Sequence, residues 1–123
     1  MKLRLAFLAS AMVLAAGTGV SLADDAYPSG CVSCHAEADM TVGAMLEGLG
    51  HKKIDNMVET VPTDCMECHS EDGGFGELYE FLHPAHYAAD SKFVAEFEGK
   101  CTHCHAMDVE SGEVSVKSGA KNW

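Results

Sequence analysis

Residues 31–35 read Cys31-Val32-Ser33-Cys34-His35, and the same pattern, two cysteines three positions apart followed at once by a histidine, occurs twice more. The second copy is Cys65-Met66-Glu67-Cys68-His69, and the third is Cys101-Thr102-His103-Cys104-His105. The copies begin 34 and 36 residues apart and use all six cysteines of the chain. The chain is therefore organised as three near-equal segments with one motif each.

C-x-x-C-H is the attachment signature of a c-type haem, because the two thiols can form thioethers to one porphyrin while the adjacent histidine reaches the iron. A secreted disulfide framework would not explain a histidine after every second cysteine. A zinc site needs four ligands per metal, and three equal C-x-x-C pairs do not fit that count. A thioredoxin-like redox pair would occur once, within a βαβ pattern that the sequence lacks. The motifs predict three covalently attached haem c groups, bound by Cys31, Cys34, Cys65, Cys68, Cys101 and Cys104, with His35, His69 and His105 as proximal iron ligands.

Residues 1–23 have the composition of a cleaved signal peptide. Lys2 and Arg4 precede an apolar run over 5–20, which ends in a small-residue cleavage site. An uncleaved membrane anchor is the competing interpretation, but the run is rich in alanine, is interrupted by glycine and meets two aspartates directly. We therefore expect a trihaem domain of residues 24–123, exported to the periplasm without stable membrane insertion.

The expected domain is acidic and poor in apolar side chains. The chain has 19 acidic and 8 basic residues, and loss of Lys2 and Arg4 with the signal leaves 6 basic residues and a net charge of -13. Leu, Ile, Val and Phe make up 17 of the remaining 100 residues, a range in which chains usually stay disordered. Three haems would supply the missing apolar surface. Nucleic acid is excluded as a partner, because binding it requires a basic face.

We accordingly expect a mainly irregular fold with short α-helices, packed compactly around three covalent haems. Hydrophobic spacing predicts one helix within 37–49, a second through 75–82, and a third that begins after Ser91 and ends at Gly99. Residues 106–123 contain no cysteine or histidine and are predicted to form a polar tail. Their spaced valines leave a strand as the alternative.

The distal ligands decide the chemistry, because a six-coordinate haem only passes electrons, whereas a five-coordinate haem can bind a substrate. Four histidines lie outside the proximal positions: His51, His83, His86 and His103. His83 and His86 share one helical face, so each could serve a different haem. His103 is tethered on the proximal side of its own haem and is expected to face solvent or to support another ligand. We therefore expect His51, His83 and His86 as distal ligands, with methionine as the alternative ligand type.

The segment Phe81-Leu82-His83-Pro84-Ala85-His86, together with the three motifs, resembles small periplasmic multihaem cytochromes c. These are the cytochrome c3/c7 type, the small tetrahaem cytochromes and the haem domain of flavocytochrome fumarate reductases. In those relatives the histidines of an F-x-H-x-x-H segment ligate two different haems, which the resemblance implies for His83 and His86. The segment here precedes the third motif, an order more similar to the tetrahaem group, whose fourth motif is missing.

We expect an electron-transport protein of anaerobic respiration with no catalysis of its own. It would relay electrons from a membrane quinol-oxidising cytochrome to a terminal reductase, for which a periplasmic flavoprotein is one candidate. Its acidity predicts docking on a basic patch of that redox partner. Two alternatives stay open: a small haem reductase or gas-binding protein with one open or methionine-ligated iron, and a permanent cytochrome subunit of a larger reductase.

Overall fold

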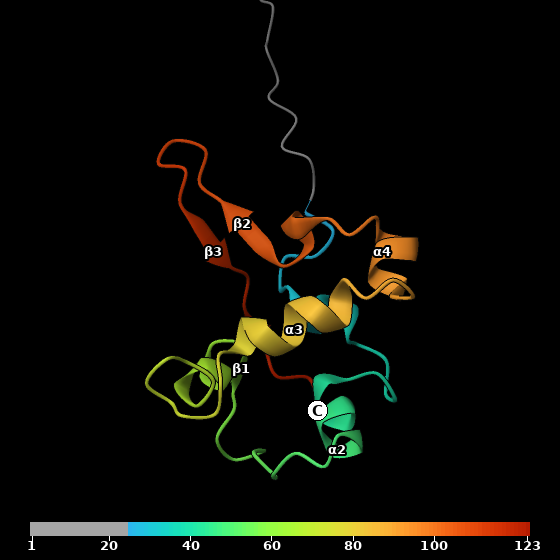
Figure 1. Cartoon of the computed structure of the whole chain (residues 1–123), viewed down its shortest axis with the longest axis vertical. Coiled ribbons are helices and arrows are strands. Elements are labelled where there is room, and N and C mark those ends of the chain that lie inside the picture. Colours follow the sequence, from blue (N-terminus) through green and yellow to red (C-terminus); the bar gives the residue numbers. More distant parts are fainter. Residues whose placement is uncertain (1–24) are drawn as a thin grey trace, which may run out of the picture.

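The computed structural model describes residues 25–123, so the predicted signal peptide lies outside the described residues. Short helices are joined by long irregular segments (Figure 1). The elements are α1 (Cys31–Cys34), α2 (Val42–Gly48), β1 (Thr60–Val61), η1 (Asp64–Glu67), α3 (Leu78–His86), α4 (Lys92–Phe97), η2 (Cys101–His103), β2 (His105–Met107), β3 (Val114–Val116) and β4 (Gly119–Ala120). Within residues 25–123, no helix combines the length and apolar character needed to cross a bilayer.

Side-chain caps set where two of the predicted helices begin. The Thr41 hydroxyl accepts a hydrogen bond of 3.2 Å from the Ala44 amide, so α2 starts within the predicted range 37–49 rather than at its edge. The Ser91 hydroxyl accepts from the Phe93 amide at 3.1 Å, which confirms the predicted start of α4. This helix ends at Phe97, two residues before Gly99, and both Glu98 and Gly99 adopt a left-handed conformation with a φ of 58°.

Helix α3 begins later than predicted and lies in the middle of the view in Figure 1. Gly76 has a φ of 78°, a left-handed conformation that a helix cannot contain, so Phe75 is left outside. The side chains of Glu77 and Glu80 then form a capping box at the start of the helix. The result is a nine-residue helix that carries both His83 and His86.

The predicted polar tail is wrong, because residues 106–123 are folded onto the rest of the chain. Strands β2 and β3 form an antiparallel hairpin in which His105 pairs with Val116, and β4 pairs with β1. Gly119 allows the close approach, since a Cβ there would lie 2.4 Å from Cγ2 of Val32 in α1. The alternative interpretation, a strand at the spaced valines, is confirmed by β3 at Val114 and Val116.

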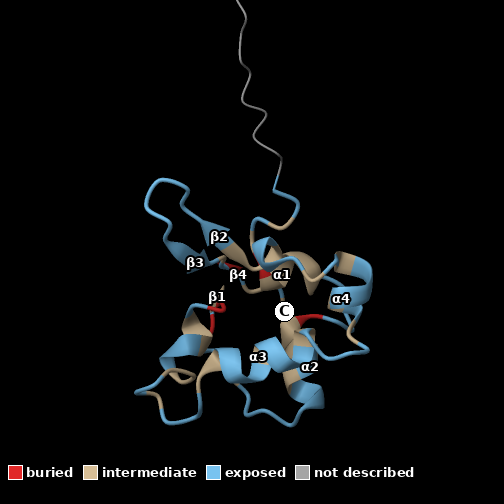
Figure 2. Ribbon diagram, turned by 45° about the horizontal axis from the view of Figure 1, so that its top comes forward, coloured by how far each residue is buried: buried red, intermediate tan, exposed pale blue. Residues whose placement is uncertain are grey.

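Very little of the described chain is buried against itself. Val58 and Val61 are the buried apolar side chains of residues 25–123, with 3% and 2% exposure, and no large side chain there is fully buried. Figure 2 shows buried residues only in a few short patches. Exposed aromatic side chains include Phe75, Tyr79, Phe81 and Tyr87. The polypeptide thus leaves much of its apolar surface for contact with another group.

Candidate haem-binding sites

Each motif histidine lies beside one histidine from outside the motifs. The pairs are His35 with His86, His69 with His51, and His105 with His83. The ring centres are 6.1 Å apart in all three pairs. The six histidines singled out in the sequence are therefore brought together two by two, in a pairing that the sequence did not specify.

This separation suits one metal ion between two imidazoles. A ligating imidazole nitrogen lies about 2 Å from a transition metal, so two rings on opposite sides of one ion have centres about 6 Å apart once the ring radii are added. Edge-on aromatic contacts cover a similar range. The distinctive feature is that one value recurs in three pairs, each with one motif and one outside histidine, whereas the contacts of these histidines with Phe and Tyr rings vary from 5.4 to 6.4 Å.

Hydrogen bonds orient four of the six rings. The Nδ1 atoms donate to backbone carbonyls: His35 to Met40 (3.0 Å), His51 to Lys52 (2.8 Å), His69 to Gly76 (3.2 Å) and His86 to Leu82 (2.8 Å). Because a carbonyl can only accept, Nδ1 must carry the proton, and Nε2 keeps its lone pair. Metal-ligating histidines typically have this arrangement, in which the second nitrogen fixes the tautomer.

The first and third pairs show two further signs of a ligand site. Burial lowers the pKa of His35, against the effect of its Met40 hydrogen bond, and so favours the neutral imidazole that a metal requires. In the third motif, Nδ1 of His105 is buried and has no hydrogen-bond partner among the described residues. An unsatisfied buried nitrogen is rare in a purely structural position, and functional sites are one place where it occurs.

The six cysteines are unpaired. Burial raises the pKa of the Cys31 thiol to about 11, and a negative charge on Cys104 is the next largest cause. The pKa of Cys34 is raised by the same two effects. The third motif thus affects the first, and the partner histidines of these two motifs, His83 and His86, both lie on α3.

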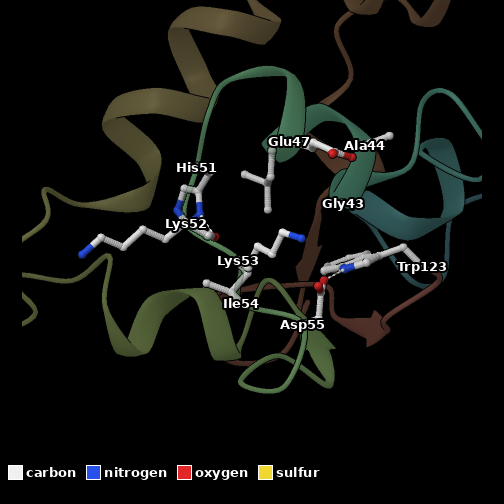
Figure 3. Close-up of a pocket in the computed structure, with 10 residues that line it drawn as sticks. Gly43, Ala44, Glu47, His51, Lys52, Lys53, Ile54, Asp55 and Trp123 are labelled. Carbon is white, nitrogen blue, oxygen red and sulfur yellow. Dashed lines mark hydrogen bonds between the residues drawn. The ribbon is translucent and has the colours of Figure 1, made fainter.

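A cavity of about 360 Å³ opens beside His51, between α2, the segment after it and the last residue of the chain (Figure 3). Ala44, Ile54 and Trp123 supply apolar walls, and the charged lining residues are of both signs: Lys52, Lys53, Glu47 and Asp55. A haem is flat and apolar and carries carboxylates at one edge, so it suits the apolar walls and the lysines but not the two acidic side chains. The fit to the group that the motifs predict therefore rests on the histidine pairs.

The seventh histidine, His103, has a different environment. Its ring centre lies 4.4 Å from that of Tyr27, and the rings of Phe93 and Phe97 lie 6.0 and 6.4 Å away. Its Nε2 donates to the Phe97 carbonyl at 3.1 Å. Of the two expectations for His103, the one that it faces solvent is wrong, because it is half-buried in an aromatic cluster apart from the three histidine pairs. That it supports another ligand stays a prediction.

Residues 117–123, here called the C-terminal strap, contact the segments of all three motifs. The Lys117 amide donates to the Cys104 carbonyl at 2.8 Å, and Nδ2 of Asn122 donates to the His35 carbonyl at 2.7 Å. The hydroxyls of Ser118 and Thr63, two residues before Cys65, share a hydrogen bond of 2.7 Å. Sequence reasoning missed the strap, and the one signal pointing to it was the single tryptophan, Trp123.

A zinc site would need about four ligands in one place, and residues 25–123 do not bring three such side chains together. A haem iron with two histidines takes only two ligands from the protein, which is what each pair offers. Comparison of the chain with protein-family models, curated proteins and solved structures gave no match.

Proposed function

We propose that the protein is an exported electron-transfer protein that carries three c-type haems, each with two histidine axial ligands. The observation that carries the proposal is the recurrence of one motif histidine beside one outside histidine at 6.1 Å in all three motifs. When bound, the haems supply one-electron redox chemistry. The chain would hold the ligand rings, fix the tautomers of four of the six and cover the porphyrin faces with side chains that otherwise stay exposed.

Two histidines per iron leave no open position for a substrate, so the haems would exchange electrons only with one another and with partner proteins. Helix α3 supports a close relay, because its two histidines belong to different pairs. Side chains three residues apart on a helix have Cβ atoms about 5–6 Å apart. The haems of the first and third motifs would therefore be immediate neighbours in the relay.

The proposed partners are redox proteins at the two ends of this relay. A membrane quinol-oxidising cytochrome would donate electrons in the periplasm, and a terminal reductase, with a flavoprotein as one candidate, would accept them. The net charge of -13 expected after export favours an acceptor with a basic patch near its cofactor. Such a complex would be small and short-lived, as electron-transfer encounters are.

Mass spectrometry of the intact exported protein tests the proposal. The expected mass is that of residues 24–123 plus three haems, and the C65A/C68A variant should lose one haem. A smaller mass excess in the wild type would contradict the proposal for at least one motif. Carbon monoxide added to the native reduced protein tests the enzymatic alternative: rapid binding would indicate an open or weakly held iron position.

A further inference from the structure

Lys117 places an enclosed positive charge inside the third motif. Its side chain is only 10% exposed, and its Nζ donates to the carbonyl of Thr102, a residue between Cys101 and Cys104, at 2.6 Å. Its backbone amide also donates to the Cys104 carbonyl. The ammonium is therefore fixed against the loop that would lie on the third haem.

The ammonium has a counter-ion on its outer side. Asp25 Oδ2 lies 2.6 Å from Nζ, and the Asp25 side chain is 48% exposed. The Tyr27 carbonyl, at 3.4 Å, is a third acceptor for the same amine. Water screens the half-exposed carboxylate more than the enclosed ammonium, so the positive charge has the larger effect on the interior of the motif.

A fixed charge beside a haem acts on its reduction. The electron that reduces the iron adds negative charge, so a nearby cation favours the reduced state and a nearby anion opposes it. The Lys117 ammonium is held at the Thr102 carbonyl, between the two cysteines that would bind the third haem, so its charge would act on that haem.

We propose that Lys117 is a positioning residue that raises the reduction potential of the haem bound by Cys101, Cys104 and His105, and that Asp25 moderates this effect. The inference rests on the proposed function, since it requires a haem at the third motif. It goes further by assigning opposite electrostatic roles to the two members of one ion pair.

Spectroelectrochemical titration of the three-haem protein tests the inference. In K117Q, one haem should become harder to reduce, with its reduction equilibrium constant lowered about tenfold, equal to about 59 mV for one electron. In D25N, the potential of the same haem should rise. K117R, which keeps the charge, should stay near the wild type, and the double variant K117Q/D25N should lie between the two single variants.

Lys100→Gln is the matched control. Lys100 directly precedes Cys101 and is paired with Glu98, but its side chain is 53% exposed, so removing this charge should shift the potential much less. The variant H83M replaces the partner histidine of His105, so the haem that it perturbs should be the one that K117Q shifts. If the wild-type protein carries fewer than three haems, the proposed function itself is contradicted. Three haems with K117Q and D25N shifting in the same direction, or with neither shifting, would overturn this inference alone.

Discussion

His83 and His86 lie three residues apart on α3, and each stands beside the histidine of a different motif. His86 pairs with His35 of the first motif, and His83 pairs with His105 of the third motif. His35 and His105 are 70 positions apart in the chain. Less than one turn of helix thus joins two segments that are distant in sequence. His51, on the loop after α2, completes the second motif instead.

Replacing the outside histidines one at a time should perturb a different haem each time. H86M, H51M and H83M are expected to alter the haems of the first, second and third motifs respectively, with a higher potential or a high-spin signal. Visible spectroscopy and redox titration measure both changes. Removing a motif's own cysteines in the same background identifies the altered haem: in H51M/C65A/C68A, the perturbed signal should disappear.

His103→Met is the control for this series, because His103 packs in an aromatic cluster and pairs with no motif histidine. The low-spin haem content of H103M should equal that of the wild type. Loss of a low-spin haem in H103M, together with no change in one of the other three variants, would show that the assignment of distal ligands is incorrect.

The three histidine pairs differ in the angle between their ring planes, and this should be visible by electron paramagnetic resonance. The planes meet at 80° in the His35–His86 pair but at 45° and 42° in the other two pairs. Nearly perpendicular imidazoles act on both iron orbitals that can overlap with them, which leaves those orbitals closer in energy. The oxidised protein should therefore give two similar low-spin signals and a third with larger anisotropy.

H86M should remove the strongly anisotropic signal and leave the two similar ones. Three indistinguishable signals in the wild type, or loss of one of the two similar signals in H86M, would contradict the pairing of His35 with His86.

The sequence predicts the cysteines and histidines of the candidate site, because attachment to a single porphyrin would require the motif spacing. Which histidine pairs with which motif could not be predicted, since that depends on how α3 and the loop around His51 fold back on the motifs. The C-terminal strap was missed for a related reason. Its contacts to Cys104 and Glu59 use backbone atoms, which leave no trace in residue type.

Asn122 gives the strap a side-chain contact that can be tested. Its Nδ2 donates to the carbonyl of His35, so N122A should loosen the first motif without touching any cysteine. We expect three haems by mass, a loss of about 1 kcal/mol in the free energy of unfolding, and faster carbon monoxide binding to the reduced protein. Denaturant unfolding followed at the haem absorption band measures the stability.

Asn56→Ala provides the matched control for N122A. Asn56 is the other asparagine of the chain, lies exposed in a turn, and makes no side-chain hydrogen bond within the described residues. N56A should unfold like the wild type. Equal stability of N122A, N56A and the wild type would show that the Asn122 contact contributes nothing to the hold on the first motif.

The acidic charge should make electron transfer to the partner depend strongly on salt. With -13 expected on residues 24–123, attraction to a basic patch accelerates encounter. Salt screens this attraction, because the Debye length falls from about 30 Å at 0.01 M to about 3 Å at 1 M. Stopped-flow oxidation of the reduced protein by its acceptor should therefore slow steeply as ionic strength rises.

E71Q/D72N, which neutralises two exposed carboxylates in the loop after the second motif, should be slower at low salt and less salt-dependent. A rate that is flat or rises with salt would reject electrostatic docking and favour a permanent subunit of a larger reductase.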